Sequence, residues 1–378
     1  MPDGAAVPGH GRRPPAGNGA LRPGGGLRWL AVVATVTMFL VVVAGALVTA
    51  TGSGEGCGRS WPLCGSPEWT LQAVIEFSHR VISGIAALAV VALAVLAPRR
   101  LGGRRDARWL AAVAVVFLFL QAGLGAGVVL WGQSDAVLAL HFGISLVSFA
   151  SVALLSLRVL RGAAAPAGRA GQEGPGSGGH GVPAVLRRGL WLVLGYTYLV
   201  VYTGAYVRHT QSSLACPAWP ACGTAWEGAA LVQMVHRLAA GALLVGLGIL
   251  VVMARRHGRE LPALVRGTWL AAGLAVLQAA SGAYVVLSRL ELAAAMLHSS
   301  IMALLFTVLC HLALEAAGPA WSLHGGVATA AGRPPSSQPG PAVAAGAGEP
   351  ASLAGSPAPA SAPAARSSRP AGAPSGPA

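Results

Sequence analysis

Four histidines stand inside long apolar stretches, where an ionisable side chain is costly and by default marks a functional site. They form two pairs, His79 with His141 and His236 with His298, and each member of the second pair follows its counterpart by 157 positions. Two imidazoles facing each other inside one helix bundle can occupy both axial positions of a haem iron. The pattern therefore favours two haem sites of the same design.

Two other interpretations of the histidines remain open. A lone histidine within the membrane is commonly hydrogen-bonded to a neighbouring helix, and only the duplication in register favours ligation instead. A closed zinc or copper site needs further ligands, and no cluster of His, Cys or carboxylate residues accompanies either pair in the sequence.

All four histidines are predicted to lie at the same depth in the membrane. At about 1.5 Å per residue along a helix, each lies roughly 8–12 Å below the same membrane surface.

One carboxylate distinguishes the two copies of the pattern. Glu76 precedes His79 by three positions, and the aligned residue in the second copy is Gln233. A carboxylate one helical turn from an iron ligand can act as a base or stabilise a developing cation, whereas an amide can do neither. Glu76 is thus the candidate catalytic residue, with pairing to Arg80 as the alternative role.

Three further pairs of residues recur beside the histidines, and each has two interpretations. The arginines could bind haem propionates or backbone carbonyls. The glycines could clear space for a flat macrocycle or allow close helix packing, and the glutamines could steady a histidine or join two helices. These pairs are Arg80 and Arg237, Gly84 and Gly241, and Gln121 and Gln278.

The elements that carry these residues are apolar stretches long enough to cross a bilayer, which takes about 20 residues. The chain is 54% apolar and only 10% charged, so the membrane is its expected solvent. Unbroken apolar runs predict helices rather than barrel strands. The predicted spans are Leu30–Ala50, Leu71–Leu96, Trp109–Leu130, Ala136–Leu157, Leu190–Val207, Ala229–Met253, Thr268–Leu287 and Leu292–Ala313.

The spans repeat in groups of four. Gly45 aligns with Gly204 at a spacing of 159, and Gln121 aligns with Gln278 at the histidine spacing of 157. Because four is an even number, both copies have the same orientation in the membrane. The sequence predicts an all-α membrane protein whose eight transmembrane helices form two tandem, pseudo-symmetric four-helix bundles.

The bundles divide the chain into predicted domains. The ends and the connecting segment are rich in Gly, Pro, Ala and Ser, and they lack the large apolar side chains that a core needs. A signal peptide is the competing interpretation of the first span, which is longer than a usual signal-peptide core. We predict disordered tails at 1–26 and 317–378, a first four-helix bundle at 27–161, a cytoplasmic linker at 162–187 and a second four-helix bundle at 188–316.

Charge and cysteine indicate the orientation. The net charge of +14 is spread over short arginine clusters between apolar stretches, without interleaved aromatics, which argues against nucleic acid and for topology signals. The positive-inside rule predicts a multi-pass cell-membrane protein with both termini cytoplasmic. Cysteine loops then face the oxidising extracytoplasmic side, where two disulfides are expected, and a redox role for the first stays open. The cysteines are Cys57 with Cys64 and Cys216 with Cys222.

Taken together, these residues resemble the haem A synthase family, in the bacterial form with paired outer cysteine loops. The resemblance spans about residues 28–316, including Glu76, the four histidines and both cysteine pairs. It implies that His236 and His298 hold a permanent haem b. It also implies that His79 and His141 receive haem O, whose C8 methyl group is oxidised to a formyl group with oxygen from water.

The resemblance implies partners as well. These are the haem O substrate, membrane lipid, the haem O synthase (a farnesyltransferase) that supplies the substrate, and an electron acceptor for which a quinone is a candidate.

Two alternative functions belong to other classes of protein. A non-catalytic dihaem b-type membrane electron carrier would hold two equivalent haems, and a transporter with parallel repeats would need polar residues near the midplane.

Overall fold

The computed structural model describes residues 24–65, 68–132, 134–162, 182–223, 226–258 and 260–318. Within these ranges the chain forms eight α-helices of 25–30 residues, each apolar enough to span a membrane, one short 3₁₀ turn and no strand. Each predicted span lies inside one helix. The helices are α1 (Gly25–Ala50), α2 (Leu71–Arg100), α3 (Arg105–Trp131), α4 (Asp135–Gly162), α5 (Ala184–His209), α6 (Gly228–Arg256), α7 (Pro262–Leu287) and α8 (Leu292–Ala316), with the turn η1 (Ser212–Leu214).

Most of the helices extend a few residues beyond the predicted spans. α2, for example, continues past Leu96 through Pro98 to Arg100. The predicted spans followed apolar side chains only, whereas arginine is a good helix former and places its charge outside the hydrocarbon. The hydrophobic pattern thus predicts the membrane-embedded part of each helix, and the full helix is longer.

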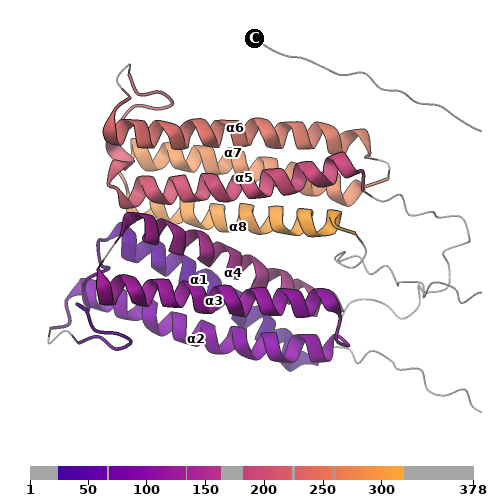
Figure 1. Ribbon diagram of the computed structural model, residues 1–378, viewed down its shortest axis with the longest axis horizontal. Coiled ribbons are helices and arrows are strands. Elements are labelled where there is room, and N and C mark those ends of the chain that lie inside the picture. The colour runs from indigo at the N-terminus through magenta and orange to yellow at the C-terminus, as the bar shows by residue number, and fades with distance from the viewer. Residues whose placement is uncertain are drawn as a thin grey trace, which may run out of the picture. The chain divides into compact units, whose positions relative to one another are not determined.

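The eight helices form two groups of four (Figure 1). In the first group α1 packs on α2 and α4, and α3 packs on the same two helices; α5 to α8 repeat this arrangement. The groups meet through α1 and α4 on one side and α5 and α8 on the other. The predicted architecture of two tandem four-helix bundles is confirmed.

α4 is the most deeply buried of the eight helices. Its small polar residues allow close approach and bond neighbouring backbones, as is common where membrane helices pack tightly. The Ser148 hydroxyl donates to the carbonyl of Ala114 on α3 at 3.2 Å, and the Ser156 hydroxyl donates to that of Ala31 on α1 at 3.0 Å. α4 therefore holds a fixed position between its neighbours.

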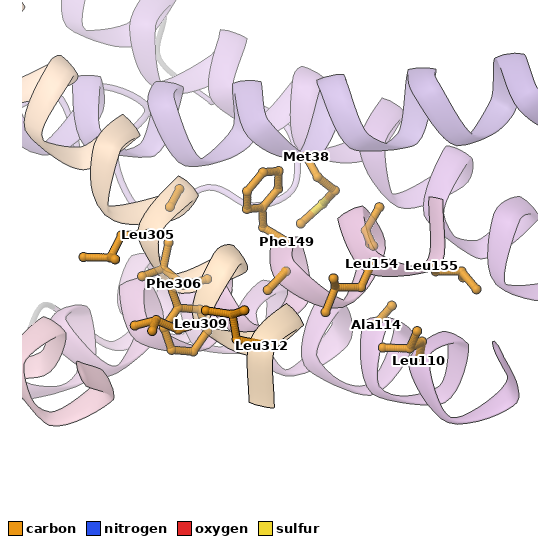
Figure 2. Close-up of a cluster of buried hydrophobic side chains, with 14 of the residues drawn as sticks. Met38, Leu110, Ala114, Phe149, Leu154, Leu155, Leu305, Phe306, Leu309 and Leu312 are labelled. Carbon is orange, nitrogen blue, oxygen red and sulfur yellow. The ribbon is translucent and has the colours of Figure 1, made fainter. Parts of the chain in front are cut away.

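One apolar core runs through both groups. Figure 2 shows Met38 of α1, Phe149 and Leu154 of α4, and Phe306 and Leu309 of α8 in one cluster of buried side chains. Phe39 and Phe149 add an aromatic contact, with ring centroids 5.8 Å apart. Close packing of this kind has low compressibility, so the histidine-bearing helices α4 and α8 are held in a fixed relation.

A buried ion pair joins two helices of the first group at the end that lies away from the cysteine loops. The Arg158 guanidinium on α4 lies 2.9 Å from the carboxylate of Asp106 on α3, and both side chains are buried. Arg104 reaches the same carboxylate at 3.1 Å from a more exposed position. Arg158 thus belongs to the packing between α3 and α4, in addition to its place among the arginines at this end.

Most of the predicted tails and linker lies outside the described residues. α1 begins at Gly25 and α8 ends at Ala316, next to the predicted tail boundaries at 26 and 317. α4 ends at Gly162 and α5 begins at Ala184. The division into domains stays a prediction.

Candidate functional site

The four histidines lie on the even-numbered helices α2, α4, α6 and α8. His236 and His298 line one cavity. The side chains of His79 and His141 lie close enough to interact electrostatically, as do those of His141 and His209 at the end of α5. The helices therefore bring together the two pairs that the sequence predicted, one pair in each bundle.

Each histidine ring packs against a glycine on the preceding helix. A methyl group added at Gly204 would lie 2.7 Å from Cε1 of His236, and one added at Gly282 would lie 3.1 Å from Cε1 of His298. The first bundle repeats the contact at 3.3 Å, from Gly45 to His79 and from Gly125 to His141. A side chain at any of these positions would displace the ring, so the glycines set where the imidazoles lie.

The glycines singled out from the sequence have a different environment. A methyl group at Gly84 or Gly241 would meet no heavy atom within 4 Å, and Gly241 borders the cavity of the second bundle. Open space at these positions agrees with the interpretation that they leave room for a ligand. The four glycines that contact the histidine rings were visible in the sequence only as repeated residues, because a contact between two helices cannot be read from the sequence of either one. These are Gly45, Gly125, Gly204 and Gly282.

A cavity of about 460 Å³ opens between the helices of the second bundle. His236 and His298 both line it, and most of its other lining residues are apolar. The first half contributes to the wall through α1 and through Phe142 of α4, the residue that follows His141. An apolar cavity of ordinary ligand-binding size, in which His236 and His298 each lie beside a glycine, fits a haem held by two histidines.

The two halves differ in what surrounds the histidine Nδ1 atoms. In the second half Nδ1 of His236 lies 3.1 Å from the Thr203 hydroxyl, and Nδ1 of His298 lies 2.9 Å from the Ser281 hydroxyl. In the first half Nδ1 of His79 and of His141 are buried without a hydrogen-bond partner among the described residues. The pairs are thus alike in position and different in bonding.

Gln278 contacts a histidine directly. Its amide nitrogen lies 3.1 Å from Nε2 of His298, so it makes the histidine contact that was one of its two predicted roles. The side-chain oxygens of both glutamines lack a hydrogen-bond partner in the described part of the chain, and within it no side-chain contact joins Gln121 to a histidine. The glutamines therefore differ between the halves, as the Nδ1 partners do.

Both arginines that follow a histidine hold a cysteine loop. Arg80 donates through Nη1 to the carbonyls of Ser60 at 2.6 Å and Leu63 at 3.2 Å. Arg237 donates to the carbonyls of Ala218 at 2.8 Å and Cys216 at 2.9 Å. Of the two predicted roles, the structure therefore shows bonding to backbone carbonyls, here in the loops rather than in a helix.

Both loops are closed by the predicted disulfides. Cys57 bonds to Cys64 between α1 and α2, and Cys216 bonds to Cys222 between α5 and α6. The two loops leave the same end of the helices (Figure 1). Each bundle thus carries a cross-linked loop next to its histidine on the following helix.

Glu76 joins the histidine helix to the first loop. One oxygen of the buried carboxylate accepts from Arg80, and the other accepts from the backbone N–H of Cys57 at 2.8 Å. In the second half Gln233 instead donates to the carbonyl of Ser213 at 2.6 Å. The alternative role of Glu76, an ion pair with Arg80, is present in the structure, and the carboxylate still lies one turn from His79.

Two residues at the second cavity were not among the predicted site residues. Arg208 and His209, at the end of α5, both line it, and Arg208 donates to the carbonyl of Thr49 on α1 at 3.0 Å. The corresponding positions in the first half are Thr49 and Ala50, so the repeat offered no second copy to draw attention to them. The sequence signal that could have indicated them is this difference between the two copies.

The comparisons with known proteins agree with this arrangement. Residues 66–310, which include all four histidines and Glu76, match the model of a family described as cytochrome oxidase assembly protein. The heme A synthase of Geobacillus kaustophilus is 43% identical to this chain over 77% of its length and 91% of the relative's. That of Bacillus licheniformis is 43% identical, covering 76% of this chain and 95% of the relative's. The chain belongs to the haem A synthase family.

Membership of the haem A synthase family confirms the resemblance seen in the sequence. The heme A synthase of Geobacillus thermodenitrificans, 42% identical over 77% of this chain, extends the similarity to a further relative. The aligned length is close to the eight-helix region, from Gly25 to Ala316, so the similarity extends over both bundles rather than one.

Proposed function

We propose that this protein converts haem O to haem A, by oxidising the C8 methyl group of haem O to a formyl group. The observation that carries the proposal is the duplicated histidine pair with a carboxylate in one copy only, in a chain of the haem A synthase family. Two matched sites with one chemical difference suit an enzyme that keeps one haem and modifies another.

The second half is the proposed cofactor site. His236 and His298 line the same apolar cavity and would hold a haem b between their rings. When bound, haem b supplies one-electron transfer chemistry. The protein's part is to keep both rings in place through Gly204 and Gly282 and to surround the macrocycle with apolar side chains.

The first half is the proposed substrate site. His79 and His141 have the same glycine contacts as the second pair, and haem O would bind between them. Phe142 follows His141 on α4 and lines the second cavity, so one short segment of backbone touches both sites. This proximity supports the passage of electrons from the substrate half to the cofactor half.

Glu76 is the proposed catalytic residue. It is buried one turn before His79, where no counterpart carboxylate exists in the second half. A carboxylate there can take up a proton released from the methyl group or from water, or stabilise positive charge that develops on the substrate. Its bonds to Arg80 and to the Cys57 N–H fix its position.

The proposed reaction proceeds in two steps of two electrons each. The methyl group and one water give the alcohol, two protons and two electrons, and the alcohol then gives the formyl group with the release of two more of each. Water supplies the oxygen atom. The four electrons pass to an acceptor, for which a quinone is a candidate.

We further propose that the cysteine loops face the extracytoplasmic side and that both termini are cytoplasmic. Disulfides form in oxidising compartments, and arginines cluster at the helix ends away from the loops. The haem O synthase, which makes the substrate, is the proposed partner in the same membrane.

The decisive test is chromatography of extracted haems. Cells that make haem O are grown with and without this protein, and its insertion into the membrane is verified by immunoblot. Appearance of haem A only in cells containing the protein is expected. Unchanged haem O beside correctly inserted protein would overturn the proposal, and two equivalent haems retained on that protein would favour the dihaem carrier.

A further inference from the structure

The hydroxyl groups next to the second histidine pair occupy equivalent places. Thr203 directly precedes Gly204 on α5, and Ser281 directly precedes Gly282 on α7. Each glycine supports a histidine ring, and the adjacent hydroxyl lies within 3.1 Å of that ring's Nδ1. The same pair of residues thus sets both the position of the ring and the partner of its Nδ1.

The direction of these hydrogen bonds follows from the helix backbone. The Thr203 hydroxyl donates its single hydrogen to the carbonyl of Val200 at 2.9 Å, and the Ser281 hydroxyl donates to that of Gln278 at 2.9 Å. With the hydroxyl hydrogens placed on these carbonyls, each oxygen is an acceptor toward the histidine, and Nδ1 then carries the proton. Nε2 is unprotonated in this tautomer, which is the form that binds a metal.

The contact between Gln278 and His298 agrees with this protonation. The amide nitrogen of Gln278 is a donor, and it lies 3.1 Å from Nε2 of His298. With its amide in this orientation, Gln278 donates to an unprotonated Nε2. The contact with Gln278 is therefore consistent with the form of the ring that the Ser281 hydroxyl favours.

The first half lacks both hydroxyls. The residues that precede its supporting glycines are Ala44 before Gly45 and Leu124 before Gly125, and neither can accept a hydrogen bond through its side chain. The carbonyl of Gln121 lies near the ring of His141, yet Nδ1 of this histidine makes no hydrogen bond in the described part of the chain. The difference between the halves is thus encoded at two aligned positions.

We propose that Thr203 and Ser281 are positioning residues that make the second haem site a retaining one, and that Ala44 and Leu124 leave the first site exchangeable. An acceptor at Nδ1 orients a ligating histidine and makes it a stronger base, and its loss typically lowers metal affinity about 10- to 100-fold. An enzyme with a permanent haem and a haem substrate needs this difference. The inference rests on the proposed function, in which the second half holds the cofactor.

The test compares haem release from purified full-length protein in detergent. The double variant Thr203→Val and Ser281→Ala removes both acceptors with little change in volume, and Thr203→Ser keeps a hydroxyl as the matched control. Transfer of haem to excess apomyoglobin is followed by absorbance. We expect release to be about 10-fold or more faster in the double variant and within about twofold of the unmodified protein in Thr203→Ser.

A second readout separates positioning from packing. A ligating imidazole that loses its Nδ1 acceptor donates less electron density to iron, which disfavours the ferric state. The reduction potential of the low-spin haem is therefore expected to rise in the double variant and to stay at the value of the unmodified protein in Thr203→Ser. An unchanged potential together with unchanged release would overturn the inference.

The reciprocal change tests the first half. Ala44→Thr with Leu124→Ser supplies the missing acceptors, and the purified protein is expected to retain additional haem and to release it more slowly than the unmodified protein. This arm keeps the inference testable if the double variant of the second half does not fold, because haem retention that stays at the unmodified level would contradict it.

One further variant separates a failure of this inference from a failure of the proposed function. His236→Ala removes the proposed ligand itself, so it should lose the low-spin haem spectrum. If His236→Ala keeps that spectrum, the ligand assignment is wrong. If it loses the spectrum while the hydroxyl variants behave as the unmodified protein does, only the role of Thr203 and Ser281 is wrong.

Discussion

Glu76 and Gln233 differ by one functional group, yet they hold their loops in opposite senses. The carboxylate of Glu76 accepts from the backbone N–H of Cys57, whereas the amide of Gln233 donates to the carbonyl of Ser213. The first loop therefore offers a backbone N–H to Glu76, and the second loop offers a backbone carbonyl to Gln233. The acidic residue is thus part of how the first loop folds as well as the proposed catalytic group.

Replacing Glu76 by Gln separates these two roles. The amide oxygen can still accept from the Cys57 N–H, so the loop should stay attached, but the group can no longer take up a proton. We expect haem A formation to fall at least about 100-fold, the usual scale for a lost general base, while the low-spin haem spectrum of the second half is unchanged. Haem chromatography and absorbance spectra measure both. Glu55→Gln, the same change at an exposed residue of the first loop, should have no effect on either; full activity in Glu76→Gln would remove this residue from the mechanism.

At the scale of the helices, the contact between a glycine and a histidine ring recurs between each odd-numbered helix and the next. It is tightest between α5 and α6, where a methyl group at Gly204 would lie 2.7 Å from His236, against 3.3 Å for Gly45 and His79. At 2.7 Å the ring or a helix must move, whereas at 3.3 Å a shift of a few tenths of an ångström suffices. The second bundle therefore tolerates less change at this contact.

Gly204→Ala should accordingly impair the proposed cofactor site more than Gly45→Ala impairs the proposed substrate site. Overpacking of this kind costs about 1–3 kcal/mol, enough to move the ring away from its ligating position. We expect purified Gly204→Ala protein to contain substantially less low-spin haem, measured as haem per polypeptide. Gly195→Ala, on the same helix with no atom within 4 Å of the new methyl group, is the control; equal haem content in the two variants would contradict the positioning role of Gly204.

Much of the helical architecture could be predicted from the sequence because long apolar runs and an in-register repeat constrain it strongly. All eight spans, both disulfides and the proximity of His79 to His141 follow from such patterns, whereas their pairing around a haem stays a prediction. Contacts between helices are a different matter. The role of Gly204, and the bonding of Arg80 to a loop, depend on the rotation of one helix against its neighbour, which a single sequence does not specify.

At the scale of the whole molecule, the buried ion pair and the proposed functional residues lie at opposite ends of the first bundle. The buried pair of Asp106 and Arg158 joins α3 to α4 near the helix ends that lie away from the cysteine loops. His79 and Glu76 lie toward the loop end. Changes at the ion pair should therefore affect unfolding without altering the histidine sites.

Asp106→Asn tests this separation. It leaves the buried Arg158 guanidinium facing an amide in place of a carboxylate, and loss of one partner of a buried pair costs roughly 3 kcal/mol or more. We expect a lower Tm of the detergent-solubilised protein and an unchanged haem spectrum below the transition. Arg104→Gln removes only the more exposed partner of Asp106, and its effect should stay within about 1 kcal/mol. An equal loss of Tm in both variants would show that burial does not decide the outcome.

The walls of the second cavity come from both ends of the chain. Ala46 and Phe142 belong to the half that leaves the ribosome first, and His298 and Met302 belong to the final span. The pocket therefore has no complete form until α8 has entered the bilayer, however early its other helices do so. A haem held as proposed between His236 and His298 can then be bound only after α8 is in place, and nascent chains that stall before α8 emerges lack His298.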